Sequence, residues 1–260
     1  NAAAGRKAIA PFVTAGDPDT ATTAEVLAAI DRAGATLIEL GVPYSDPIAD
    51  GAVIQASYVR ALARGMTLDR LFATVKDLTG QIATPVLAMV SYSIIYRRGI
   101  ERFVAESVAA GLAGFVVPDL PIEESDDLGA ACATAGLALV RLVTPTTPPE
   151  RAEQIARQST GFLYCVSVAG VTGARTALPE GLIERVAWLR TKTSVPILVG
   201  FGISTPEQAR AVAAVADGVI VGSALVRRLA EAEAAAPRQA VAAIEQHVRD
   251  LVTAVAGAAE

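Results

Sequence analysis

The sequence predicts a single (β/α)8 TIM barrel as one domain over residues 1–260, and three observations lead to this prediction. Short apolar runs rich in β-branched residues recur about eight times, amphipathic stretches with helix signals lie between them, and no linker or low-complexity segment interrupts the alternation. Strands that alternate with helices form a parallel sheet, either closed into a barrel or open and doubly wound. Because alternation alone does not show closure, the open sheet stays an alternative.

The predicted strands are apolar almost throughout and do not alternate between apolar and polar residues. In chain order they are IAPFV (9–13), TLIELGV (36–42), PVLAMV (85–90), GFVVPD (114–119), LALVRLV (137–143), GFLYCVSV (161–168), PILVGFG (196–202) and GVIVGSA (218–224). Such runs are typical of strands that are buried on both faces, as in a parallel sheet covered by helices.

The stretches between these runs carry signals that start and end helices. Thr205 and Pro206 suit a helix cap followed by the first helical position, whereas Gly34, Gly111 and Gly136 suit helix ends. The predicted helices lie at 19–34, 99–111, 148–158, 179–192 and 205–217, with two more at about 53–63 and 68–78 in the long gap after the second strand. We therefore expect an extra helix after the second strand, and also a C-terminal helix.

Composition is typical of a compact globular enzyme and excludes several classes of protein. Of the 260 residues, 52% are apolar and 19% are charged, with a formal net charge of −5 and no basic run of the kind that nucleic acid requires. No apolar window approaches the roughly 20 residues that span a bilayer, and no charged start followed by an apolar stretch marks a signal peptide. We therefore expect a cytoplasmic enzyme without a nucleic-acid or membrane partner.

The residue types that most often build metal sites and nucleophilic triads are scarce. Cys132 and Cys165 stand alone, without metal-type spacing, and we expect them to be small buried hydrophobic residues. His247 is the single histidine and lies among charged residues near the carboxyl terminus, where a solvated helix face is expected. With one histidine and no CxxC motif, the chain offers neither a histidine-based metal site nor a Ser-His triad.

Candidate catalytic residues occur in the segment LIELGVPYSDPIADG, residues 37–51. Glu39 lies inside an apolar strand, where a carboxylate is costly to desolvate, and Asp50 follows in a loop that can fold over the end of the same strand. Burial would raise the pKa of Glu39 and leave the pKa of the more solvated Asp50 little changed, which supplies an acid and a base near neutral pH. The pattern alone leaves a turn or helix-cap role open for Asp50, and Asp46 is expected to be a loop-structuring turn residue.

Small residues at the expected carboxyl ends of the last strands indicate an anion site. Gly173, Gly202, Gly222 and Ser223 follow the sixth, seventh and eighth strands, where glycine allows backbone N–H groups to approach an oxyanion closely. A helix that starts at about Ser223 would direct its positive end to the same corner, where barrels commonly bind phosphate. The loop 169–181 is expected to be a lid that closes over the phosphate. Ordinary strand-to-helix turns and a surface loop without function stay open as alternatives.

The segment LIELGVPYSDPIADG occurs together with five further motifs in a specific order. These are FVTAGDP (12–18), VPDLPIEES (117–125), AGVTG (169–173), GFGIS (200–204) and VGSALV (221–226). On these motifs nearly the whole chain resembles the tryptophan synthase alpha subunit, and several motifs in order are a stronger indication than one short pattern. The resemblance implies a lyase that cleaves indole-3-glycerol phosphate by a retro-aldol reaction into indole and glyceraldehyde 3-phosphate.

The resemblance also implies a role for each candidate residue. Glu39 would deliver a proton to the indole ring carbon and take one from the glycerol hydroxyl, while Asp50 would accept from the indole N–H and stabilise the positive charge on the protonated ring. The other implied binding residues are Phe12 and Tyr164 at the indole pocket, Gly173, Gly202, Gly222 and Ser223 at the phosphate, and Thr172, which would couple lid closure to Asp50. No metal or organic cofactor is implied for this chain.

A partner protein is implied in the same way. Family members pair with a beta subunit that uses pyridoxal phosphate, as an alpha2beta2 heterotetramer, and indole passes to it through an internal channel. The implied docking surface is the catalytic rim, including the insert after the second strand, with Asp119 a candidate contact. The chain departs from the family at residues 91–94, which read Ser-Tyr-Ser-Ile where many members have a Tyr-x-Asn-Pro type segment.

Three other functions are alternatives to cleavage of indole-3-glycerol phosphate as one subunit of a complex. A stand-alone lyase that releases free indole would use the same catalytic residues, and turnover without a partner would distinguish it. Intact acid chemistry at Glu39 counts against a regulatory binding module whose duty is to activate a partner. A sugar-phosphate epimerase lacks support because the chain offers no metal-binding set of histidines.

Overall fold

The computed structural model is a closed barrel of eight parallel strands, which confirms the predicted fold class. It describes residues 6–47, 50–167, 180–200, 202–233 and 237–257. The strands are β1 (Ala8–Thr14), β2 (Ile38–Gly41), β3 (Val86–Met89), β4 (Gly114–Val116), β5 (Ala138–Val143), β6 (Leu163–Val166), β7 (Ile197–Gly200) and β8 (Gly218–Val221). Residues 8–11 of β1 pair with residues 218–221 of β8, so the sheet closes and the open, doubly wound alternative is wrong.

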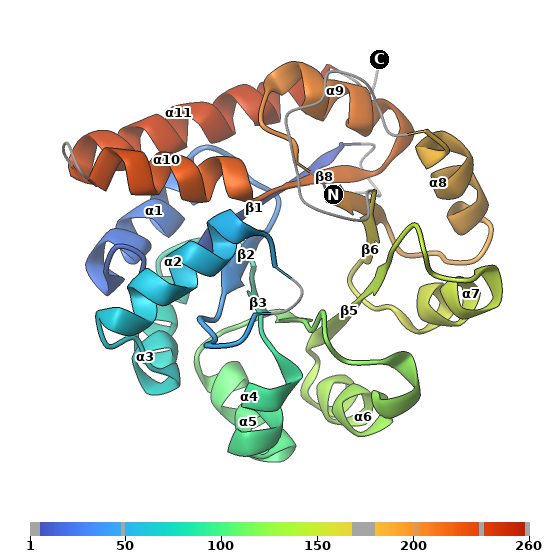
Figure 1. The fold of residues 1–260 in the computed structure, drawn as a ribbon, viewed down its shortest axis with the longest axis horizontal. Coiled ribbons are helices and arrows are strands. Elements are labelled where there is room, and N and C mark those ends of the chain that lie inside the picture. The colour runs from blue at the N-terminus through green and yellow to red at the C-terminus, as the bar shows by residue number, and fades with distance from the viewer. Residues whose placement is uncertain (1–5, 48–49, 168–179, 201, 234–236, 258–260) are drawn as a thin grey trace.

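Eight helices form an outer ring around the strands (Figure 1). They are α1 (Thr20–Arg32), α3 (Leu68–Thr79), α5 (Ile100–Ala109), α6 (Asp126–Ala135), α7 (Pro149–Gln158), α8 (Leu182–Arg190), α9 (Pro206–Val215) and α11 (Pro237–Ala256). Further helices within the described residues are α2 (Ala52–Ala63), α4 (Tyr92–Arg98), α10 (Ser223–Glu233) and the short 3-10 helix η2 (Ile122–Glu124). The extra helix after β2 and the C-terminal helix are therefore confirmed, whereas α4 is not predicted from the sequence.

Local side-chain contacts explain where several helices begin. Asp19 accepts a hydrogen bond from the Thr22 N–H at 2.7 Å at the start of α1. Thr205 and Gln208 form the reciprocal capping box that starts α9, with Pro206 at its first position, as the sequence predicts. Gly136 ends α6 with a φ of 71°, a left-handed conformation that residues with a side chain rarely adopt.

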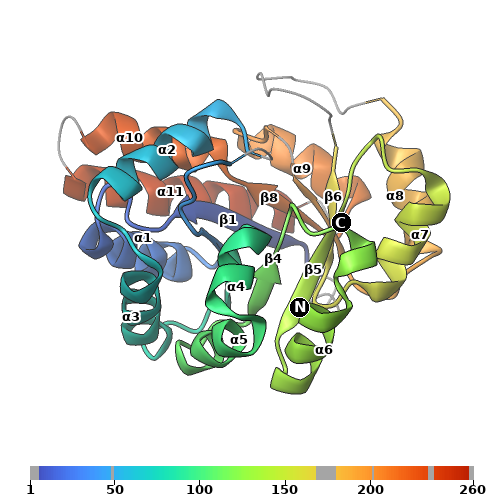
Figure 2. The same cartoon turned by 60° about the horizontal axis from the view of Figure 1, so that its bottom comes forward.

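The core has two layers, which the closed sheet separates. The larger cluster packs the outward-facing strand residues against the ring helices. The smaller cluster fills the barrel interior with Ala10, Phe12, Leu87, Met89, Val116, Val140, Phe162, Leu198 and Ile220, and it also receives Tyr58 from α2 and Val226 from α10. The two helices that reach this interior cluster, α2 and α10, pack against each other, and α10 lies beside α11 (Figure 2). Side chains thus enter the barrel from these helices as well as from the strands.

Two expectations about single residues meet different outcomes. Cys132 and Cys165 are buried free cysteines, as predicted, and burial raises the pKa of each thiol to about 11. The expectation of a solvated face for His247 is wrong, because the side chain is only 7% exposed. Its helix, α11, packs against α1, α9 and α10, which leaves this position little access to water.

Among the helices within the described ranges, none combines the length and the apolar character that crossing a membrane requires.

Candidate active site

Strand β2 directs Glu39 into the barrel. Glu39 pairs in register with Phe12 of β1 and Leu87 of β3, and both of these belong to the interior cluster. Residues paired across a parallel sheet face the same side, so the carboxyl lies inside the barrel. The side chain is 1% exposed, and its Oε1 has no hydrogen-bond partner among the described residues. Burial raises the pKa of Glu39 to about 8, as the sequence predicts in direction.

Asp50 lies directly before α2, and the main chain around it is held by that helix. The Gln55 side-chain amide donates to the Asp50 carbonyl at 2.7 Å and to the Pro47 carbonyl at 3.0 Å. The pKa of Asp50 is raised to about 6, first by burial and then by the negative charge of Asp119. The expectation that this pKa changes little is therefore wrong, since the carboxyl is half-buried in a cavity that contains a second carboxylate. Asp46 accepts a hydrogen bond from the Ser45 hydroxyl at 2.5 Å and is exposed, which agrees with a role in shaping the loop.

Three aromatic side chains surround these acids. Phe12 and Tyr58 are almost fully buried, and Tyr164 packs against the same interior cluster. The pKa of each tyrosine is raised well above 10, mainly by burial and further by the charges of Glu39 and Asp50. Both hydroxyl groups therefore remain neutral donors in the field of the two carboxyls.

Glycines in the strands make room for these rings. A Cβ atom on Gly41 would lie 2.4 Å from Cζ of Phe12 and 3.0 Å from the hydroxyl oxygen of Tyr58. A Cβ atom on Gly200 would lie 2.3 Å from the hydroxyl oxygen of Tyr164. Since real Cβ contacts essentially never fall below 3.0 Å, a side chain at Gly41 would displace the Phe12 ring and one at Gly200 would displace the Tyr164 ring.

The predicted anion corner is described in part. Gly222 accepts the first hydrogen bonds of α10, from the N–H groups of Leu225 at 2.9 Å and Val226 at 3.2 Å, and Ser223 is the first residue of that helix. The N–H groups that come before these bonds at the start of a helix have no acceptor within it and point out of that end. Gly202, with a φ of 37°, follows β7 next to this corner. Thr172, Gly173 and most of the expected lid lie outside the described residues.

Asp119 lies in the middle of the loop after β4 and holds the segment that departs from the family pattern. Its carboxylate accepts hydrogen bonds from the Ser91 hydroxyl at 2.6 Å and from the Tyr92 N–H at 2.8 Å. Asp119 thus supplies, from outside the helix, an acceptor for an N–H at the start of α4 that has none within it. A cavity of about 30 Å³ between β2, β3 and β4 is lined by Asp119 together with Asp50 and Tyr58. The charge of Asp119 therefore acts on the site directly.

These groups can carry out acid-base chemistry at neutral pH. Between the two pKa values, about 6 for Asp50 and about 8 for Glu39, the first carboxyl is ionised and the second is protonated. Both acids lie close enough to Tyr58 and Tyr164 to raise the pKa of these tyrosines. A neutral acid and a carboxylate in one region can protonate one atom of a substrate while stabilising positive charge on another. The sequence predicts this pair, together with Phe12 and Tyr164. Tyr58 is not among the predicted residues, because nothing in its own segment places it in the barrel interior.

Comparisons with known proteins agree with the resemblance seen in the sequence motifs. A family model described as Tryptophan synthase alpha chain matches residues 1–256. The tryptophan synthase alpha chain of Synechocystis sp. is 53% identical over 252 residues, which cover 96% of this chain and 94% of the relative. The tryptophan synthase alpha chain of Rhodopirellula baltica is 54% identical over 230 residues, which cover 87% of this chain and 83% of the relative.

Solved structures agree in fold over almost the whole length. The tryptophan synthase subunit alpha from Legionella pneumophila matches with a TM-score of 0.88 and 36% identity, covering 98% of this chain and 94% of that one. A chain from work on mutual activation of the tryptophan synthase a2b2 complex of Pyrococcus furiosus matches with a TM-score of 0.87 and 38% identity, covering 95% of this chain and 99% of that one.

Proposed function

This chain belongs to the tryptophan synthase alpha chain family, whose members cleave indole-3-glycerol phosphate to indole and glyceraldehyde 3-phosphate, and we propose that Glu39 and Asp50 carry out this cleavage. One observation supports the proposal above the others. Glu39 is buried without a hydrogen-bond partner for its Oε1 among the described residues, and its pKa is raised to about 8. A carboxyl that stays protonated at neutral pH can give its proton to carbon, which a solvated carboxyl does poorly.

The reaction would proceed in two proton transfers. Glu39 donates its proton to the indole ring carbon that carries the glycerol chain, and the ring takes on positive charge. The Asp50 carboxylate accepts a hydrogen bond from the ring N–H and stabilises that charge. Glu39, now ionised, removes the proton from the adjacent glycerol hydroxyl, the carbon-carbon bond breaks, and its electrons return to the ring. The products are indole and an aldehyde, and Glu39 is again protonated.

The remaining candidate residues would bind the two ends of the substrate. Phe12 and Tyr164 lie in or against the interior cluster and would line the indole pocket. The start of α10, with Gly222 and Ser223, would bind the phosphate through its N–H groups and a hydroxyl, together with Gly202. Thr172 and Gly173, which lie outside the described residues, are proposed for the lid and the phosphate on the basis of the family motif.

A beta subunit is the proposed partner. The Pyrococcus furiosus relative comes from work on an a2b2 complex, and it covers nearly all of this chain at 38% identity. We extend from this to an alpha2beta2 heterotetramer, with pyridoxal phosphate in the beta subunit and no organic cofactor in this chain. Asp119 is the proposed contact residue, since it orders the start of α4 at the catalytic end of the barrel.

Purified protein mixed with indole-3-glycerol phosphate tests the proposal, with indole as the product that is followed. The native chain should release indole, and Asp50→Asn should lose about 3 kcal/mol or more of transition-state stabilisation, which is on the order of a hundredfold in kcat/KM. Asp77→Asn is the matched control, because Asp77 is exposed on α3 and does not line the cavity that contains Asp50. Equal rates for the native chain and Asp50→Asn would overturn the role of Asp50.

A second arm of the experiment concerns the partner. Slow release of indole by the chain alone, with stimulation by added beta subunit, is expected of a subunit. Fast turnover that added beta subunit leaves unchanged would contradict the proposed complex and favour the stand-alone lyase.

A further inference from the structure

Tyr58 is a polar side chain inside the barrel to which the proposed mechanism gives no task. It comes from α2, not from a strand, yet it is 3% exposed and belongs to the interior cluster. Its hydroxyl makes no hydrogen bond within the described part of the chain, and it lines the same cavity as Asp50. The oxygen is not among the fully buried side-chain atoms that lack a partner, so it is open to this cavity, where a ligand oxygen can accept its proton.

The position of this hydroxyl relative to Glu39 follows from β2. Gly41 comes two residues after Glu39, so both residues face the barrel interior. A Cβ atom on Gly41 would lie 3.0 Å from the Tyr58 hydroxyl oxygen. The hydroxyl thus occupies the position directly beyond Glu39 on the interior side of β2, toward the mouth of the barrel and toward Asp50.

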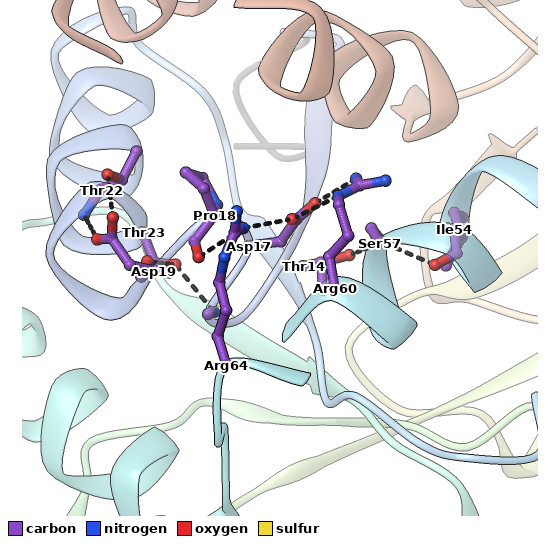
Figure 3. A network of polar contacts seen from close by, with 11 residues as sticks. Thr14, Asp17, Pro18, Asp19, Thr22, Thr23, Ile54, Ser57, Arg60 and Arg64 are labelled. Carbon is purple, nitrogen blue, oxygen red and sulfur yellow. Dashed lines mark hydrogen bonds and ion pairs between the residues drawn. The ribbon is translucent and has the colours of Figure 1, made fainter. Parts of the chain in front are cut away.

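Polar contacts on either side of Tyr58 hold this part of α2 against the end of β1 (Figure 3). The Ser57 hydroxyl lies 2.6 Å from that of Thr14 and bonds the Ile54 carbonyl at the same distance. Arg60 donates to both oxygens of Asp17, at 2.9 Å and 2.6 Å, and Asp17 is 3% exposed. Because its helix is fixed on both sides, the Tyr58 ring has a defined position before any substrate arrives.

We propose that Tyr58 contacts the substrate and donates a hydrogen bond to the glycerol oxygen that Glu39 deprotonates. This inference rests on the proposed function. The oxygen gains negative charge as its proton moves to Glu39 and the carbon-carbon bond breaks, and it ends as the aldehyde oxygen. A neutral donor that is fixed in place before the reaction stabilises such charge more in the transition state than in the ground state. Burial and the two nearby carboxyls raise the pKa of Tyr58, which keeps its proton in place for this role.

Tyr58→Phe removes the donor and keeps the ring. We expect kcat for indole-3-glycerol phosphate to fall at least tenfold, since removing a single oxyanion donor costs about 10²–10³ in kcat. Binding of indole-3-propyl phosphate, an analogue without glycerol hydroxyls, should change by less than twofold, because it offers no oxygen to Tyr58. Tyr96→Phe, on the 71% exposed Tyr96 of α4, is the matched control.

The outcomes separate this inference from the proposed function. If the native chain cleaves the substrate, Glu39→Gln does not, and Tyr58→Phe keeps kcat within twofold, only the role of Tyr58 is overturned. If Tyr58→Phe weakens analogue binding as much as it lowers kcat, the residue shapes the pocket and the inference is overturned as well. If the native chain does not cleave the substrate with or without beta subunit, both the proposed function and the inference fail.

Discussion

The variant Glu39→Gln should be more stable than the native chain, by an amount that grows as the pH rises, although the substitution should abolish cleavage. In the folded chain burial raises the pKa of Glu39 from 4.5 to about 8, and in the unfolded chain the side chain is solvated. Between these two pH values the folded state binds a proton that the unfolded state has lost. The free energy of unfolding contributed by this group is therefore fully present below pH 4.5 and is lost as the pH rises toward 8.

The size of the effect follows from the shift. The window from 4.5 to about 8 spans about 3.5 pH units. At about 1.4 kcal/mol per unit, native Glu39 costs the fold about 5 kcal/mol once it is forced to ionise, and about 3 kcal/mol at pH 7. Glutamine has nearly the same shape and carries no charge, so the Glu39→Gln variant avoids this cost at every pH.

Urea unfolding at pH 5, 6, 7 and 8 measures the effect, with the fluorescence of Trp188, the single tryptophan, as the probe. The difference in unfolding free energy between Glu39→Gln and the native chain should grow in favour of the variant with each step in pH. Glu101→Gln is the control, because Glu101 is exposed at the start of α5 and lies outside the barrel interior. Parallel pH profiles for the native chain and Glu39→Gln would refute the reasoning.

Three further predictions concern pH and packing. The profile of kcat/KM against pH should be bell-shaped with limbs near 6 and 8, where Asp50 ionises and Glu39 loses its proton, and a flat profile across this range would contradict the assignment. Asp17→Asn should lower the free energy of unfolding by about 3 kcal/mol in urea, because Asp17 is buried and the variant loses its charge and one of its two acceptors for Arg60, and a change below 1 kcal/mol would contradict this. The pKa of His247 is lowered by burial and then by the charge of Arg228, while Asp250 has an opposing effect. The free energy of unfolding should therefore decrease as the pH falls below 6.5, and in urea unfolding His247→Phe should remove this pH dependence.

The strands are predictable from the sequence because burial on both faces leaves a continuous apolar run, which needs no long-range information. Glu39 is predictable for the same reason, since a lone carboxyl in such a run stands out. The ring helices are predictable from caps that lie within four residues, as at Thr205 and Gln208. In contrast, α4 starts at a cap supplied by Asp119, whose partner Tyr92 is 27 residues away, and nothing local indicates it.

Tyr58 and His247 show what local patterns do not contain. Tyr58 enters the barrel only because Arg60 and Ser57 attach α2 to residues 43 positions earlier in the chain. His247 has charged neighbours in sequence, which suggests a solvated face, but α11 closes the ring between α1 and α9 and buries it. In both cases the environment of the side chain is set by packing of distant elements. The pKa of Asp50 is another example, since the charge of Asp119, which lies far away in the sequence, contributes to raising it.

The most direct test is a titration of the Glu39 carboxyl itself. Infrared difference spectra between the native chain and Glu39→Gln, recorded from pH 4 to pH 9, isolate the carbonyl stretch of this one protonated acid. The band is expected to persist through neutral pH and to disappear with a midpoint near 8. A midpoint near 4.5, the value of a solvated glutamate, would mean that Glu39 is ionised at neutral pH and has no proton to give to the indole ring.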